Sequence, residues 1–131
     1  LLDDGIVPVV YPIGKDADGR MLNVNADTMA AGIAAGLKVD EMIAITDVPG
    51  ILTDVSDPSS KLDEVTTGQI DGMIADGTIS GGMIPKVDAC RAALDAGAKA
   101  VRMVDGRDPG ISLRKAMEGA PCGTLIVKGS R

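Results

Sequence analysis

Short apolar runs alternate with helix-like segments along this chain. Residues 41–46 (EMIAIT), 100–104 (AVRMV) and 124–128 (TLIVK) have the length and the β-branched character of buried strands, and turn-forming residues bound them. Segments with apolar positions at helical spacing lie between these runs. Such an alternation predicts an α/β fold, in which a mostly parallel sheet is flanked by helices.

Three further segments have the pattern of helices. In 26–37, built mainly of small residues, apolar side chains recur every four positions, and Asn25 is a suitable N-cap. The stretch 66–76 places three apolar side chains on one face, although its two glycines weaken it. A short helix is expected over 111–118. The small side chains of 26–37 predict close packing against a neighbouring helix.

A fourth helix is expected to begin at Pro85, because proline is favoured at the first helical position. Val87, Cys90 and Leu94 follow at helical spacing, and Gly97 stands where a glycine cap ends a helix. This segment is therefore the helix that the sequence predicts most clearly.

The first part of the chain predicts a hairpin. The apolar run 6–13 (IVPVVYPI) and the segment 20–24 (RMLNV) are separated by turn residues that include Asp18-Gly19. Two short antiparallel strands are expected here.

Composition excludes several kinds of chemistry. The chain of 131 residues is 45% hydrophobic but has no His, Phe or Trp, so it contains neither a Ser-His-Asp triad nor an imidazole metal site. A net charge of −6, with scattered basic residues, argues against partnership with nucleic acid or a membrane surface, and no apolar run is long enough to span a bilayer. Cys90 and Cys122 have no metal-site spacing, so we expect reduced thiols in a cytoplasmic protein with no metal of its own.

A glycine pair, Gly81-Gly82, leads into the helix that carries Lys86. Glycines let a backbone approach a ligand closely, and free N–H groups at a helix start attract anions. A lysine in that first turn opposes the helix dipole unless an anion lies nearby. A phosphate site and a solvated surface lysine are both compatible with this pattern.

The loop after 41–46 is a second candidate. Pro49-Gly50 suits the central positions of a type II turn, and Thr46 and Asp47 are ordinary turn formers. The apolar residues Val48 and Ile51 could also form a flat wall for a nucleobase. In open α/β sheets, ligands gather at the carboxyl ends of strands, which is where this loop lies.

The segment 23–28 (NVNADT) allows two interpretations. Asn25 can cap the following helix while Asp27 complements its dipole. Alternatively, Asn23 and Asn25 hold a small polar substrate, and Asp27 orients a cationic group.

Taken together, these motifs resemble the C-terminal half of the N-acetylglutamate kinases, within the amino acid kinase family. The resemblance implies the carbamate kinase-like fold and covers nearly the whole chain. The matching motifs are NVNADT (23–28), TDVPGIL (46–52), GGMIPKVDACRAALDAG (81–97) and VRMVDGR (101–107), with PVVYPIG (8–14) before them and Gly123-Thr124 before the last strand.

The resemblance implies ATP-dependent phosphorylation of the side-chain carboxylate of N-acetyl-L-glutamate, in arginine biosynthesis. Lys86 would stabilise the transferred phosphoryl group, and Asp27 would hold catalytic lysines in place. Asn23 and Asn25 would bind the amino-acid substrate, and ATP or ADP would bring its own Mg²⁺. The implied nucleotide-binding residues are Thr46, Asp47, Val48, Gly50, Ile51, Leu52, Ile79, Gly81, Gly82 and Met83.

By the same resemblance, residues 1–38 are the remnant of a substrate-side domain and 39–131 form the nucleotide-binding domain, within one compact unit. The family's N-terminal Gly-Gly-Lys loop is absent from the sequence, so we expect little or no turnover from the chain alone. One alternative is an active kinase completed by another chain. Another is a reconstructed or engineered fragment that self-associates without catalysis, and a homo-oligomer is expected.

Overall fold

A computed structural model describes residues 1–130, and its strands fall into two sheets. The strands are β1 (Ile13–Lys15), β2 (Met21–Asn23), β3 (Glu41–Thr46), β4 (Glu64–Thr66), β5 (Ala100–Asp105) and β6 (Thr124–Val127). The helices are α1 (Ala26–Leu37), α2 (Thr67–Ala75), α3 (Met83–Asp95) and α4 (Pro109–Met117), with the 3-10 turns η1 (Leu2–Asp4) and η2 (Pro58–Ser60).

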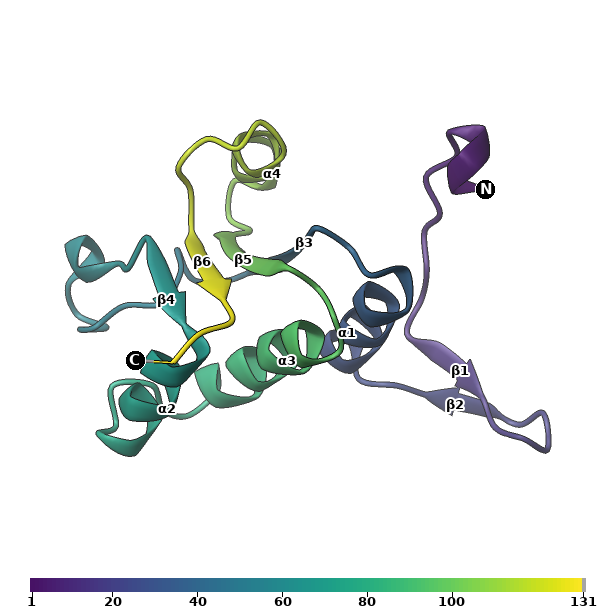
Figure 1. Ribbon diagram of the computed structural model, residues 1–131, viewed down its shortest axis with the longest axis horizontal. Helices are drawn as coiled ribbons and strands as arrows, with labels where there is room; N and C mark the ends of the chain where they lie inside the picture. The colour runs from purple at the N-terminus through teal and green to yellow at the C-terminus, as the bar shows by residue number, and fades with distance from the viewer. Residues whose placement is uncertain (131) are drawn as a thin grey trace.

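The larger sheet has the strand order β3-β5-β6-β4 (Figure 1). β5 runs parallel to β3, with Glu41 opposite Ala100 and Thr46 opposite Asp105. β4 and β6 are also parallel, whereas β5 and β6 are antiparallel. Figure 1 shows α1, α2 and α3 on one side of this sheet and α4 on the other. The expected fold, a mostly parallel sheet flanked by helices, is confirmed.

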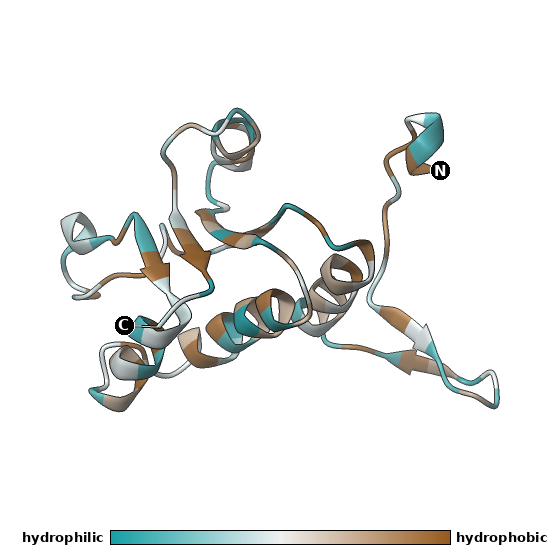
Figure 2. Cartoon of the chain, in the orientation of Figure 1, coloured by the Kyte–Doolittle hydropathy of each residue, from teal (hydrophilic) through white to brown (hydrophobic). Residues whose placement is uncertain are grey.

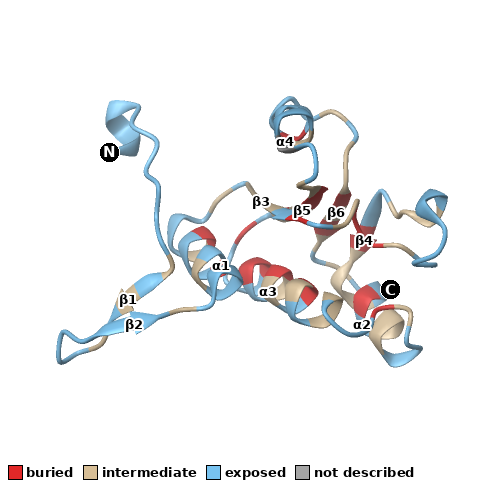
Figure 3. Ribbon diagram, turned by 180° about the vertical axis from the view of Figure 1, so that it is seen from behind, coloured by how far each residue is buried: buried red, intermediate tan, exposed pale blue. Residues whose placement is uncertain are grey.

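The core lies between α3 and the sheet (Figure 3). The apolar positions of α3 that the sequence predicts as its inner face, Val87, Cys90 and Leu94, are all buried. They pack in one cluster with Val101 and Met103 of β5. Because the single aromatic residue is exposed, aliphatic and Met side chains provide the hydrophobic stabilisation of this core.

Helix α3 begins at Met83, two residues before the predicted start at Pro85. Proline is tolerated at this third position because the first four N–H groups of a helix have no partner within it. The prediction at the other end is confirmed: Gly97 has φ 120°, and the amides of Gly97 and Ala98 donate to carbonyl oxygens of the last turn.

The other helices lie close to their predicted ranges because their caps are local. The Asn25 side-chain oxygen accepts the amide of Thr28 at 3.0 Å, which confirms the cap of α1. Thr66 and Gln69 form a reciprocal capping box before α2. Helix α4 begins two residues earlier than predicted, because the Asp108 side chain accepts an amide of its first turn.

The N-terminal hairpin is confirmed, but its first strand is shorter than the apolar run that predicts it. β1 and β2 pair antiparallel, and only Ile13 of the run 6–13 belongs to a strand. Residues 6–12 extend away from the sheet, and Figure 2 colours much of this exposed stretch as hydrophobic. Within the described chain no strand lies beside them, so their backbone has no ladder to join.

One further expectation was wrong, and one strand was not foreseen. Gly50 has φ 145°, outside the range of a type II turn, because the chain there turns against β6 instead of closing a local hydrogen bond. β4 was not predicted, since a strand of only three residues has little periodicity of its own. Its partner β6 lies about sixty residues further along the chain.

Candidate functional site

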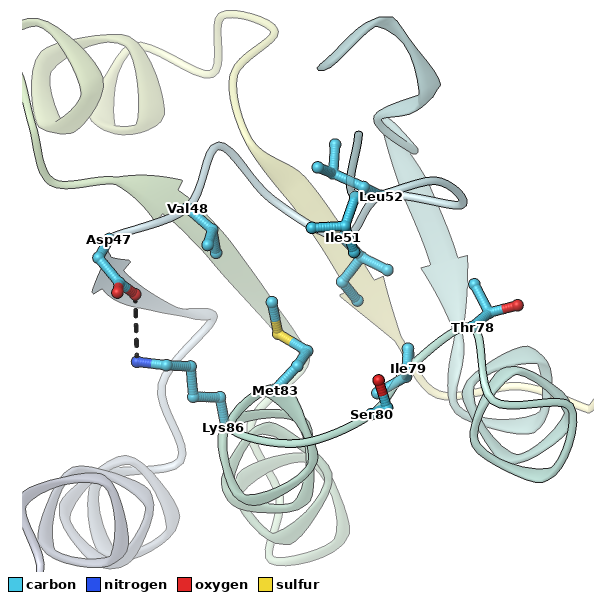
Figure 4. A pocket seen from close by; sticks show the side chains of 11 residues that line it. Asp47, Val48, Ile51, Leu52, Thr78, Ile79, Ser80, Met83 and Lys86 are labelled. Carbon is cyan, nitrogen blue, oxygen red and sulfur yellow. Dashed lines mark ion pairs between the residues drawn. The ribbon is translucent and has the colours of Figure 1, made fainter. Parts of the chain in front are cut away.

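A cavity of about 300 Å³ opens between the loop after β3 and the start of α3 (Figure 4). It lies at the carboxyl end of β3, which is where ligands bind in open α/β sheets. Its lining residues come from two stretches of the chain, 47–55 and 78–86: Asp47, Val48, Ile51, Leu52, Val55, Thr78, Ile79, Ser80, Gly82, Met83 and Lys86.

Most of the cavity wall is apolar. In Figure 4 the side chains of Val48 and Met83 point toward one another across the cavity, and Ile51 lies further along the loop that carries Val48. Ile51 and Ile79 are almost fully buried, so they belong to both the core and the wall. A pocket with apolar walls and a few polar groups at its edge is the common form of a small-molecule site.

The charged edge of the cavity is formed by Lys86 and Asp47. Lys86 is the fourth residue of α3, and its Nζ lies 3.7 Å from the Asp47 carboxylate. The Lys86 side chain is 34% exposed and that of Asp47 is 84% exposed. Asp47 therefore gives Lys86 the negative partner that a cation in the first turn of a helix needs, and a bound anion can do the same.

Three residues predicted to bind nucleotide, Thr46, Gly50 and Gly81, do not line this cavity, although they shape its loops. The Thr46 hydroxyl donates to the carbonyl oxygen of Val48 at 3.0 Å, which fixes the start of the loop. Gly50 is buried behind the wall, and Gly81 takes a left-handed φ of 55° in the turn before α3. The other predicted nucleotide residues, Asp47, Val48, Ile51, Leu52, Ile79, Gly82 and Met83, lie together on the wall.

A second cavity, of about 220 Å³, lies between α1, β3 and α3 and shares Lys86 with the first. Asp27 and Lys86 both line it, together with Thr46 and Cys90. Burial and the neighbouring Asp27 charge raise the pKa of the Cys90 thiol to about 12. The structure thus brings together Asp27 and Lys86, the two residues predicted to act in catalysis, although they are more than fifty residues apart in sequence.

The two asparagines predicted to bind substrate are both exposed. Asn23 ends β2, and Asn25 uses its side-chain oxygen to cap α1. Asn25 and Asp27 also line a third hollow between α1 and α3. The cap leaves the Asn25 amide nitrogen available, so capping and substrate contact are compatible at this residue.

The carboxyl end of β5 adds a charged pair beside the loop after β3. Asp105 lies opposite Thr46 in the sheet, and its carboxylate accepts hydrogen bonds from the Arg107 guanidinium. The hydrogen bonds from Arg107 lower the pKa of Asp105 to about 2. Asp105 is therefore ionised throughout the neutral range.

Sequence reasoning missed Val55 and Thr78 on the cavity wall, and also Thr124, a buried residue that contacts the loop from behind. Thr78 directly precedes Ile79, so proximity to the predicted nucleotide segment 79–83 could have indicated it. Val55 lies in a polar loop and Thr124 at a strand start, where no local pattern marks a site.

The described residues contain no cluster of three or more acidic, Cys or His side chains that could hold a metal ion. No helix in residues 1–130 is long and apolar enough to cross a membrane.

A sequence model of the amino acid kinase family matches residues 1–105, which is most of the chain. The chain belongs to the amino acid kinase family. The match includes β3, α3 and β5, the elements that position the cavity and its charged edge.

Individual relatives agree with this placement. The chain is 42% identical over 128 residues to the acetylglutamate kinase of Methanococcus maripaludis, covering 98% of this chain and 44% of the relative. The crystal structure of smu.665 from Streptococcus mutans UA159 superposes with a TM-score of 0.75 at 29% identity, covering 98% of this chain and 45% of that one.

Carbamate kinase from Giardia lamblia bound to AMP-PNP has a TM-score of 0.68 at 24% identity, covering 89% of this chain and 41% of that one, and supports the fold alone. The resemblance to acetylglutamate kinases is confirmed, and this amino acid kinase chain spans less than half the length of the curated relatives it matches.

Proposed function

We propose that this chain is the nucleotide-binding part of an ATP-dependent kinase that phosphorylates the side-chain carboxylate of N-acetyl-L-glutamate in arginine biosynthesis. One observation carries the proposal: an apolar cavity of about 300 Å³ has Lys86, in the first turn of α3, at its edge. The acetylglutamate kinases among its relatives supply the reaction class.

The two walls of the cavity have different tasks. The loop wall, with Val48, Ile51 and Leu52, offers apolar surface for adenosine. The α3 wall offers the Lys86 ammonium, which suits phosphate oxygens. The first two amides of α3 already donate to carbonyl oxygens of the preceding turn, and its third residue is a proline, so the charge of the lysine is the main attraction for phosphate. Phosphoryl transfer depends mainly on positioning and charge stabilisation, so a lysine in this place is the group that the reaction needs.

The residues present fit a Mg²⁺ ion that arrives with the nucleotide. Mg²⁺ commonly binds through one or two carboxylates, several waters and substrate phosphates. Asp47 provides one exposed carboxylate at the mouth of the cavity. When bound, the ion would neutralise part of the phosphate charge, and Asp47 would help to hold it.

The acceptor carboxylate would approach from the side of Asp27. The second cavity, shared by Asp27 and Lys86, supports a role for Asp27 in orienting the lysine toward the transferred phosphoryl group. Asn23 and Asn25 would contact the amino-acid substrate from the first part of the chain. This division agrees with a substrate-side segment over 1–38 and a nucleotide-binding segment over 39–131.

A homo-oligomer is part of the proposal, because the N-terminal segment exposes a continuous set of apolar side chains. Val7 and Val9 are more than 80% exposed, and Tyr11 is 72% exposed. Exposed apolar surface of this kind usually contacts protein. Sedimentation over a range of protein concentrations tests this association, and a monomer at every concentration would contradict it.

We propose the cytoplasm as the compartment, since Cys90 and Cys122 are free thiols.

The experiment that tests the nucleotide site is a calorimetric titration of the folded chain with MgATP and, separately, with adenosine. The titration measures binding instead of turnover, because the chain spans less than half of its relatives' length. The proposal expects saturable binding of MgATP that is stronger than that of adenosine. A folded chain that binds neither ligand would reject the proposal.

A further inference from the structure

Thr124, the first residue of β6, is a fully buried polar residue behind the cavity wall. Its hydroxyl oxygen accepts the amide of Ile51 at 2.9 Å, and the same hydroxyl donates to the carbonyl oxygen of Leu62 at 2.6 Å. Both bonds reach across more than sixty positions of sequence. The hydroxyl donates its one proton to one segment and accepts a bond from another, so both segments fix its place.

The two segments that meet at Thr124 form a short antiparallel pair. The amide of Leu62 donates to Ile51 at 2.9 Å, and Leu52 lies opposite Lys61. In an ordinary hydrogen-bonded antiparallel pair, both bonds run directly between the two residues. Here the Ile51 amide donates to the Thr124 hydroxyl, and that hydroxyl donates to the Leu62 carbonyl oxygen, so two bonds through a side chain replace the second direct bond. The hydroxyl therefore sets the spacing of the two segments and ties them to the sheet.

Neighbouring glycines make room for this arrangement. A Cβ atom built on Gly50 would overlap the Thr124 hydroxyl, and one built on Gly123 would overlap the Met103 carbonyl oxygen. Both glycines have positive φ, 145° at Gly50 and 61° at Gly123. The loop after β3 can therefore lie against β6 only because its residue 50 has no side chain.

Only one wall of the cavity depends on these bonds. Ile51 is held directly, and Leu52 and Val55 follow it on the same loop. The opposite wall, which carries Met83 and Lys86, belongs to α3 and has its own hydrogen bonds. A disturbance at Thr124 would therefore move the apolar loop wall relative to an unchanged charged wall.

We infer that Thr124 is a positioning residue of the nucleotide site, which holds the loop wall at the distance from α3 that an adenosine group requires. The inference rests on the proposed function and assigns this task to a residue that does not itself line the cavity. Thr124 acts through Ile51, whose amide would otherwise have no partner.

The test compares Thr124→Val with Thr124→Ser. Valine has nearly the shape of threonine but leaves the Ile51 amide unsatisfied, whereas serine keeps the hydroxyl. NMR titrations of each folded variant with adenosine and with inorganic tripolyphosphate report the two walls separately. Because a lost buried hydrogen bond is a large effect, Thr124→Val should weaken adenosine binding by about tenfold or more, with tripolyphosphate unchanged. Thr124→Ser should bind both ligands nearly as the wild-type chain does.

Selective loss of adenosine binding in the valine variant, restored by serine, supports the inference. Equal changes for both ligands, or none, overturn it, because a residue with only a structural role would not separate them. If Thr124→Val does not fold, Gly50→Ala takes its place, since its methyl group disturbs the same contact from the loop side. That variant must show the same selective loss. A wild-type chain that binds neither ligand rejects the proposed function and this inference with it.

Discussion

Lys86 and Asp47 face each other across the mouth of the cavity, with the ammonium nitrogen 3.7 Å from a carboxylate oxygen. The pair joins the first turn of α3 to the loop after β3. Because both side chains are partly or largely exposed, such a pair contributes little to stability. The pair matters for binding, because a phosphate group of the nucleotide can take the place of the Asp47 carboxylate beside Lys86.

Replacing Lys86 with alanine should separate the two parts of the nucleotide. Loss of a charge-assisted bond to phosphate should weaken MgATP binding by roughly 10- to 100-fold, while adenosine binding stays unchanged. Lys86→Arg, which keeps the charge, is the control and should retain much of the affinity in the same calorimetric titrations. Equal losses for MgATP and adenosine would show that Lys86 only supports the fold.

Replacing Asp47 with asparagine should change the dependence on magnesium. Without the carboxylate, metal-free ATP meets less repulsion and finds Lys86 unpaired, so it should bind more tightly than to the wild-type chain. The gain from adding Mg²⁺ should become smaller, because one carboxylate near the ion is lost. Titrations with and without Mg²⁺ measure both effects, and an unchanged Mg²⁺ dependence would contradict the role given to Asp47.

The two thiols should differ in reactivity. Cys90 is buried, and its pKa is raised to about 12 by burial and by the Asp27 charge, so little thiolate forms. Cys122 is only half-buried and serves as the internal reference. Alkylation at mildly alkaline pH, followed by peptide mass spectrometry, should label Cys122 first and Cys90 only after unfolding. Equal labelling rates in the folded chain would show that the α1–α3 packing opens readily.

The Asp105 carboxylate should make stability depend on pH in the acid range. Its folded-state pKa, lowered to about 2 by Arg107, lies below the unfolded value of roughly 4. The ion pair therefore stabilises the fold above the unfolded pKa, and this contribution is lost as the pH falls toward 2. Asp105→Asn should have a lower melting temperature than the wild-type chain near neutral pH, and the difference should shrink between about pH 4 and pH 2. A difference that is constant with pH would reject this assignment.

Gly123→Ala should destabilise the chain strongly, because the new methyl group would overlap the Met103 carbonyl oxygen, a backbone atom of β5. Backbone strain and overpacking together should cost more than about 2 kcal/mol. Gly119→Ala is a matched control: it has a similar φ of 69°, but its methyl group would meet no atom within 4 Å. Urea unfolding compares the two variants, and equal losses would mean that the close approach at β5 relaxes freely.

Much of the fold could be predicted because its signals are local. β3 has the predicted bounds, and α1 begins after the predicted cap at Asn25. α3 was displaced by two residues, since proline is compatible with several positions of a first turn. The N-terminal run could not be placed, because an apolar sequence favours a strand only where a partner strand is available.

Part of the candidate site could also be predicted from the sequence. Lys86 and the glycine pair were indicated by the chemistry of helix starts, and Val48 and Ile51 by their place after a strand. Val55 and Thr124 were not, because each contributes through a contact with a distant part of the chain.

The sequence by itself determined the order of the four helices and of the strands other than β4, the cap of α1 at Asn25 and the apolar face of α3, because these depend on residues a few positions apart. The tertiary structure decided the antiparallel placement of β6, the pairing of Lys86 with Asp47 and the support of Ile51 by Thr124. Their partners are far apart along the chain, and only the packed sheet brings them within hydrogen-bonding or ionic distance.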